Sequence, residues 1–156
     1  MTTDARPAPT NPLPDGVRAM WLCDAAIGAL VAVGAAFALA AAVGELMPWL
    51  PVAAASGGLA WVLVVPRARH ARWRWGLHEA ELDLLHGVWS VTRTIVPLTR
   101  IQHVAVQRTG WTGLFGLVVV RVHTAAGGTT IPGLQPAQAE DVRDRILARL
   151  RTPDDL

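Results

Sequence analysis

The sequence of 156 residues has a single cysteine, no lysine, no tyrosine and only two serines. One cysteine, Cys23, excludes an intrachain disulfide framework and a cysteine-based zinc site. The two serines, Ser56 and Ser90, leave almost no candidates for a nucleophilic hydroxyl. The chain also lacks a glycine-rich phosphate loop after a strand and paired carboxylates in a cleft-like context. We therefore predict a non-enzymatic protein that needs no cofactor.

All of the positive charge comes from 14 arginines, and 12 acidic residues reduce the net charge to +2. Between Trp75 and Arg151 there are eight arginines and six acidic residues. A nucleic-acid-binding domain would need basic residues massed on one face, so we expect no nucleic-acid partner. The five histidines are not spaced as a pair on a helix and no cysteine supports them. This pattern predicts no metal site.

An apolar block of 47 residues runs from Ala19 to Val65 and contains two charged residues, Asp24 and Glu45. Its first apolar run, Trp21–Val43, has 23 residues and contains Asp24. A cleaved secretory signal has an apolar region of about 7–15 residues, so this alternative is disfavoured and a membrane span is favoured. A third alternative, a small transporter or pore, is disfavoured because only the two acidic residues could serve an ion or substrate pathway.

The segment 44–48 combines a glycine, a charge and a proline, which predicts a turn between two helices. We therefore predict a transmembrane hairpin over residues 19–66, with helices at about residues 20–43 and 49–65. Residues 1–18 are rich in proline and small polar residues, and we predict that they form a disordered cytoplasmic tail.

Four arginines follow the second apolar run within eight positions: Arg67, Arg69, Arg72 and Arg74. Arg6 and Arg18 precede the first run, whereas the turn between the runs contains no arginine. Arginine is retained on the cytoplasmic side, so we predict two spans with both termini in the cytoplasm. The same four arginines are candidates for contact with anionic lipid headgroups, although they could serve topology alone.

After Pro66 the apolar pattern changes to a period of two, which is typical of strands. In 71–77, the alternation predicts that Ala71, Trp73 and Trp75 are buried and that Arg72 and Arg74 face water. Pro97 is expected to end one strand, and Pro132-Gly133 to end the sheet. The six predicted strands are 71–77, 81–86, 88–96, 101–108, 117–124 and 129–131, with a loop at 109–113.

The last segment changes to helical spacing. Pro136 suits a first helical turn, and apolar residues recur at helical spacing up to Arg151. These residues are Ala139, Val142, Ile146 and Leu150. Residues 67–151 are thus expected to form an antiparallel sheet of six or seven strands, curled into a barrel or sandwich and capped by one helix, with a polar tail at 152–156. The fold class is that of an α+β membrane protein.

Short motifs in this region carry a resemblance to a known family. They are Trp73-Arg-Trp-Gly-Leu77, Leu82, Leu84, Gly87, Val96-Pro-Leu98, Arg100-Ile-Gln-His-Val104, Val106, Phe115-Gly-Leu117, Gly127-Gly128 and Ile131-Pro-Gly-Leu134. Together with the two apolar spans, they resemble the bacterial membrane proteins that have a YdbS-like, pleckstrin-homology-like (PH-like) domain. The resemblance covers about residues 13–150.

The resemblance implies a PH-like domain at the cytoplasmic face of the bacterial plasma membrane, with no established catalytic activity. It also implies a partner, either another membrane protein with several such domains or a second copy. The chain departs from the family at Gly113, where a basic residue is usual. This chain therefore lacks that charge for contact with a headgroup or a partner.

Our first hypothesis is a membrane-anchored interaction module or scaffold. The candidate partner-binding residues are Arg100, Gln102, His103 and Trp111. The alternative for Arg100–His103 is that these polar residues only satisfy turn and ladder hydrogen bonds. The second hypothesis is recognition of anionic lipid, or of an envelope-active compound, through the four arginines after the second span.

Overall fold

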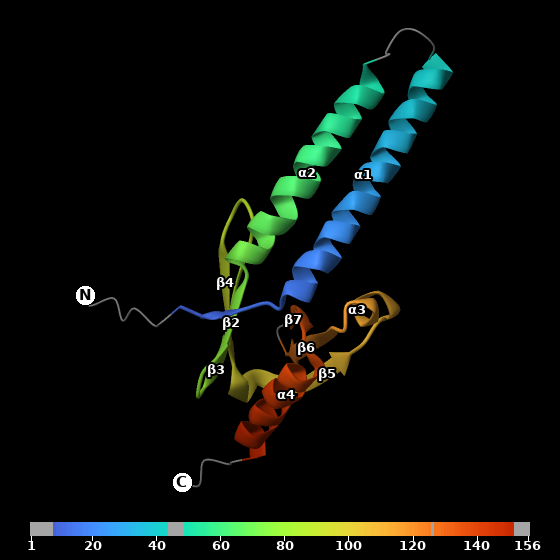
Figure 1. Ribbon diagram of the computed structural model, residues 1–156. Helices are drawn as coiled ribbons and strands as arrows, with labels where there is room; N and C mark the ends of the chain where they lie inside the picture. Colours follow the sequence, from blue (N-terminus) through green and yellow to red (C-terminus); the bar gives the residue numbers. More distant parts are fainter. Residues whose placement is uncertain (1–7, 44–48, 126, 152–156) are drawn as a thin grey trace, which may run out of the picture.

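The computed structural model describes residues 8–43, 49–125 and 127–151, and it consists of a long helical hairpin on a small domain of two sheets (Figure 1). The hairpin helices are α1 (Asp15–Val43) and α2 (Leu50–Arg72). The strands are β1 (Asn11–Pro12), β2 (Arg74–Leu77), β3 (Glu81–His86), β4 (Thr92–Pro97), β5 (Ile101–Gln107), β6 (Val118–Thr124) and β7 (Gly127–Leu134). The other helices are the 3-10 helix η2 (Leu98–Arg100), α3 (Gly110–Leu114) and α4 (Pro136–Arg151).

The two hairpin helices pack side by side (Figure 1). Many of their large apolar side chains are exposed. Each is long and apolar enough to cross a membrane, by length and composition. Leu30 is 74% exposed and Leu59 is 60% exposed. The helices approach closely at Gly58, where an added Cβ would lie 3.0 Å from the Cβ of Ala29. An outward apolar surface with all backbone groups bonded inside the helices is what a lipid environment requires.

The hairpin is inserted between the first two strands of one sheet. β1 precedes α1 and pairs antiparallel with β2, which follows α2. In this pairing, Asn11 lies opposite Trp75 and Pro12 lies opposite Arg74. One sheet has the order β1-β2-β3-β4 and the other the order β5-β6-β7. The chain therefore enters the domain, leaves it to form the hairpin, and returns to the same sheet.

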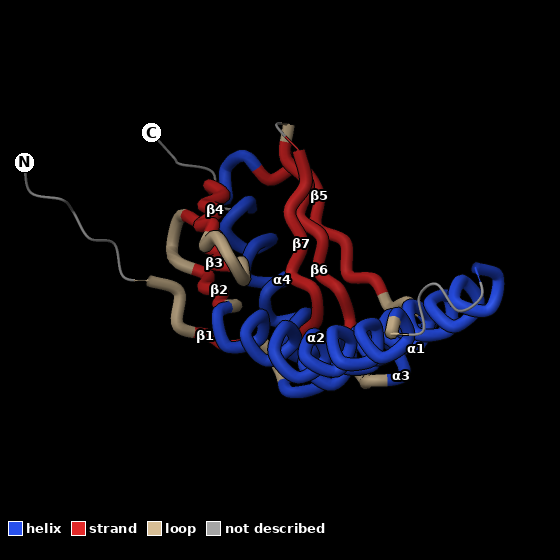
Figure 2. The backbone as a smooth tube through the Cα atoms, turned by 90° about the horizontal axis from the view of Figure 1, so that it is seen from above, coloured by secondary structure: helices blue, strands red, loops and turns tan. Residues whose placement is uncertain are grey.

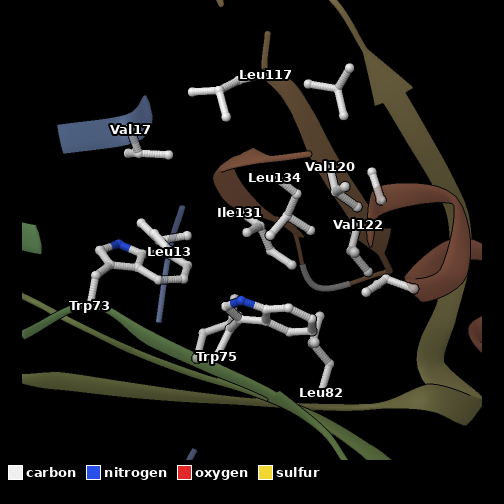
Figure 3. Close-up of a cluster of buried hydrophobic side chains, with 14 of the residues drawn as sticks. Leu13, Val17, Trp73, Trp75, Leu82, Leu117, Val120, Val122, Ile131 and Leu134 are labelled. Carbon is white, nitrogen blue, oxygen red and sulfur yellow. The ribbon is translucent and has the colours of Figure 1, made fainter. Parts of the chain in front are cut away.

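One hydrophobic core fills the space between the sheets (Figure 3). Seen from the hairpin end, the two sheets lie on either side of α4 (Figure 2). Three residues of α4 are buried as their helical spacing predicts: Ala139, Val142 and Ile146. The α+β fold with two antiparallel sheets and a closing helix confirms the predicted fold class. The core also receives Leu13 and Val17 from the segment at the start of the hairpin.

The prediction of a disordered tail over residues 1–18 is wrong for its second half. Residues 11–12 form β1, and α1 begins at Asp15. Leu13 and Val17 are 3% and 0% exposed, so their burial in the core orders this segment. Residues 1–7, the turn at 44–48 and the tail at 152–156 lie outside the described residues.

The predicted end of the second helix at residue 65 is also wrong, because α2 continues through Pro66 to Arg72. The arginine- and alanine-rich segment after the proline has high helix propensity. Arg67 supports the turn containing the proline, since its Nη1 donates to the carbonyl of Leu63 at 2.6 Å. Ala71 and Arg72 therefore belong to the helix and not to a strand.

Several segments of the sheets and their connections also differ from the prediction. β4 begins at Thr92 instead of residue 88, because residues 87–91 form a loop. The predicted loop at 109–113 contains α3, which the paired side chains of Thr109 and Thr112 cap. β7 continues through Pro132-Gly133 to Leu134, since a register irregularity opposite Val118–Val120 accommodates the proline.

Candidate functional site: the hairpin base and the open edge of β5

The two ends of the hairpin meet the domain in one cluster, which we call the hairpin base. It consists of six residues in or next to the start of α1 and the end of α2: Leu13, Val17, Trp21, Arg69, His70 and Trp73. Trp21 and Trp73 are 6% and 5% exposed, so both rings are buried. The hairpin base is thus continuous with the core of the domain (Figure 3).

Polar contacts hold the two hairpin ends to each other. The Nε2 atom of His70 lies 3.0 Å from the carbonyl oxygen of Leu13 and 3.3 Å from that of Pro14. Because carbonyl oxygens only accept, Nε2 carries the proton. The guanidinium carbon of Arg69 lies 4.2 Å from the ring centroid of Trp21, a cation–π geometry. The end of α2 is therefore fixed to the start of α1 on its domain side.

The start of α1 is also packed against β7 at very short range. A Cβ added to Gly133 would lie 2.7 Å from Cγ2 of Val17 and 3.2 Å from Cδ1 of Leu117. Only glycine leaves room for the valine here. The first turn of α1 thus behaves as part of the domain, and the helix passes from this packed turn into its exposed apolar part without interruption.

The four predicted arginines lie around the end of α2 and the start of β2, but they do not form one cluster of free charges. Arg67 bonds Leu63, and Arg69 covers Trp21. Nη1 of Arg72 donates to the carbonyl of Val88 in the β3–β4 loop. Nη1 of Arg74 donates to the carbonyl of Trp73 at 2.7 Å. A guanidinium has five N–H donors, so each arginine retains donors for a headgroup.

Three of the four predicted partner-binding residues lie together at the start of β5. Arg100 ends η2, and Gln102 and His103 follow on the strand, all with exposed side chains. A register shift between Ile101 and His103 places Gln102 at a bulge, a feature that often re-aims side chains. Trp111 lies apart from them, on α3 after the other end of β5.

β5 is an edge strand. In the described part of the chain it pairs with β6 on one side, and the sheet order places no strand on the other. An edge strand presents unpaired N–H and C=O groups that can pair with an added strand. Sequence reasoning missed His123, which the register places opposite His103 with ring centroids 6.2 Å apart. Only the register of β5 against β6 could have shown that pair.

An ion pair between a buried carboxylate, Asp83, and a solvent-accessible arginine, Arg93, lies in the first sheet. The Asp83 carboxylate is 0% exposed, and it accepts hydrogen bonds from the guanidinium of Arg93, at 3.0 Å from Nε to Oδ2. These hydrogen bonds raise the pKa of Arg93 above its ordinary value. The pair joins the neighbouring strands β3 and β4. Among residues 8–43, 49–125 and 127–151, no three His, Cys, Asp or Glu side chains gather as metal ligands would.

Comparison with known proteins agrees with this architecture. The family described as "Bacterial PH domain" matches residues 24–150. A relative, "UPF0699 transmembrane protein YdbS" of Bacillus subtilis (strain 168), is 37% identical over 99 residues, which cover 64% of this chain and 62% of the relative. No solved structure gives a significant match. With two helices able to span a membrane and two PH-like sheets, the chain belongs to the bacterial PH domain family and is a YdbS-like membrane protein.

Proposed function

We propose that this protein is a non-enzymatic, membrane-anchored interaction module whose open β5 edge binds a protein partner at the cytoplasmic face of the bacterial plasma membrane. The observation that carries the proposal is the insertion of the hairpin between β1 and β2. A domain attached through two packed ends cannot rotate freely about a single tether. β5 then has a fixed distance from the membrane surface and a fixed orientation toward other proteins in the same membrane.

The arginine distribution supports the proposed orientation. Arg18 lies in the first turn of α1, and Arg67, Arg69 and Arg72 lie in the last turns of α2. These positions are at the domain end of the hairpin, and cytoplasmic ends of spans carry the excess of arginine. Cysteine labelling in intact cells tests this orientation, with Thr99→Cys in a Cys23→Ala background. The proposal expects labelling by a membrane-impermeant maleimide only after the cells are opened.

The proposed contact is addition of a strand to β5. This strand has seven residues and no proline, and its outer edge can pair regularly from His103 to Gln107, beyond the bulge at Gln102. Gln102 and His103 would contact the side chains at one end of the bound segment, and Trp111 those at the other end. Confinement of both proteins to one membrane raises their effective concentration, so a weak contact suffices. The partner is another membrane protein or a second copy of this chain.

Site-specific photo-crosslinking in native membranes tests the contact. A photoreactive residue at Gln102 or Gln107, both exposed on β5, is expected to capture one defined protein or a dimer of this chain. The matched control is Glu140, which is equally exposed but lies on α4. Capture of the same products at all three positions, or of lipid alone at β5, would contradict the proposal.

Recognition of anionic lipid or of an envelope-active compound is the second candidate, favoured by the exposed guanidinium groups of Arg67, Arg69 and Arg72. Native mass spectrometry of protein released from mixed bilayers measures the retained anionic lipid. Replacing these arginines by glutamine would reduce retention if they grip headgroups, whereas Arg121→Gln on β6 would not. Equal retention in all variants would leave the arginines with a topological role.

A further inference from the structure

The loop between β3 and β4, residues 87–91, carries an exposed apolar surface of the domain. Trp89 is 88% exposed and Val91 is 55% exposed, although both belong to the part of the chain outside the hairpin. Tryptophan has a large apolar ring and one N–H donor, a combination that favours the boundary between water and lipid. Neither residue contributes to the core cluster of the domain.

The loop lies beside the end of α2. Arg72, the last residue of α2, donates a hydrogen bond to the carbonyl of Val88. At the foot of the loop, the ring of His86 stacks on Trp73 with centroids 6.1 Å apart. Figure 1 shows the loop rising beside the lower turns of α2, toward the apolar part of the hairpin. The loop therefore reaches the level at which α2 passes from its arginines to its apolar turns.

The shape of the loop is specified by a glycine. Gly87 has a φ of +133°, and an added Cβ would collide with the carbonyl oxygen of Ser90. A residue with a side chain would be strained in this conformation. The turn is therefore built so that Trp89 projects outward from the domain and does not fold back onto the sheet.

A second apolar site lies on the other side of the hairpin base in Figure 1. Leu114, the last residue of α3, is 75% exposed. α3 ends beside the first turn of α1, because a Cβ on Gly16 would lie 3.3 Å from the carbonyl oxygen of Phe115. The two apolar sites flank the point at which the hairpin leaves the domain.

We propose that the β3–β4 loop inserts Trp89 into the interfacial layer of the membrane that holds the hairpin, with Leu114 as a second contact. The occupant is lipid because the loop lies beside the end of α2 and rises along the hairpin toward its apolar part (Figure 1). The contact is apolar and aromatic, so it requires neither an anionic headgroup nor a protein partner. It would fix the tilt of the domain against the bilayer, independently of whether β5 binds a partner.

Spin-label depth measurement on the full chain tests the proposal. Ser90→Cys in a Cys23→Ala background places a label beside Trp89, and Thr99→Cys, exposed on η2, is the matched control. The protein is reconstituted at high dilution in vesicles of pure phosphatidylcholine. The label at position 90 is expected to be more accessible to oxygen than to a water-soluble nickel complex, and the label at position 99 the reverse.

Replacing Trp89 tests whether its side chain inserts the loop into the membrane or whether the loop only lies near the membrane surface. Trp89→Ser added to Ser90→Cys should lower the oxygen-to-nickel accessibility ratio at position 90 toward that at Thr99→Cys, while the folded domain persists. The reverse outcome, a water-exposed label at position 90 with Trp89 intact, would overturn the proposal. So would an unchanged ratio after Trp89→Ser. Because no other protein is present in these vesicles, failure here would leave the proposed β5 contact untouched.

Discussion

Replacement of Val17 tests whether the start of α1 belongs to the folded domain. Val17 is 0% exposed, and its Cγ2 lies against Gly133 of β7. Val17→Ala removes two buried carbons, each worth about 0.8 kcal/mol in transfer free energy, and leaves a cavity. The expected loss is about 2–3 kcal/mol of unfolding free energy. Small domains have about 5–15 kcal/mol in total, so this loss is large.

The matched control is Val31→Ala on the same helix. Val31 is 65% exposed on the outer surface of the hairpin, so its truncation should change stability by about 0.5 kcal/mol or less. The free energy of unfolding of both variants is measured by urea titration in mild detergent. Near-ultraviolet circular dichroism monitors the titration, because it reports the tertiary packing of the domain. Equal stability of Val17→Ala and the unmodified protein would refute the reasoning, because residues 11–18 would then behave as a tail.

Three further changes follow from the same contacts. Gly133→Ala should destabilise the domain by about 1–3 kcal/mol, because the added methyl collides with Cγ2 of Val17. The double variant with Val17→Ala should lose less stability than the two single variants added together, because Val17→Ala removes the methyl group with which the new Cβ collides. Arg93→Gln should lower the unfolding midpoint in urea by leaving the buried Asp83 carboxylate without its partner. A raised pKa keeps Arg93 charged up to mildly basic pH, so the unmodified protein should keep the stabilisation from this ion pair as the pH rises through the neutral range. Gly87→Ala should increase hydrogen exchange in residues 87–91, because the φ of +133° becomes strained.

Each of these changes has a control on the same structure. Gly57→Ala adds a methyl where nothing lies within 4 Å, so it should be nearly neutral. Arg121→Gln removes an exposed arginine of β6 and should leave the midpoint unchanged. Gly110→Ala, also with nothing within 4 Å, should leave exchange in the β3–β4 loop unaltered. If a control variant showed the same change as its test variant, the contact named for that test variant would not be the cause of the change.

The helices and most strands could be predicted because their signals are local. The 23-residue apolar run predicted α1 beyond its first turns, and alternation predicted β3 without error at Glu81–His86. Burial of Trp73 and Trp75 also followed from alternation. The position of the hairpin inside a sheet could not be predicted. β1 has two residues, and its pairing with β2 spans the whole hairpin, so no local pattern encodes it.

The candidate sites were predictable only as residue types. The arginine run was evident, but its contacts depend on the unexpected extension of α2 to Arg72. The sequence predicts Trp89 within a strand over residues 88–96, whereas residues 87–91 form a loop that begins at Gly87 with its positive φ. Arg100, Gln102 and His103 do lie on an exposed edge, but the bulge at Gln102 arises from pairing with β6. Long-range pairing thus decides what the local sequence leaves open.

The rigid attachment of the domain to its hairpin is the central claim, and a distance measurement tests it most directly. Cys23 is the single native cysteine and is exposed on α1, and Thr99→Cys adds a second label on the domain. Double electron–electron resonance between the two labels in lipid nanodiscs should give one narrow distance distribution, because the hairpin base is packed into the core. A broad distribution, as expected for a domain on flexible tethers, would contradict the claim.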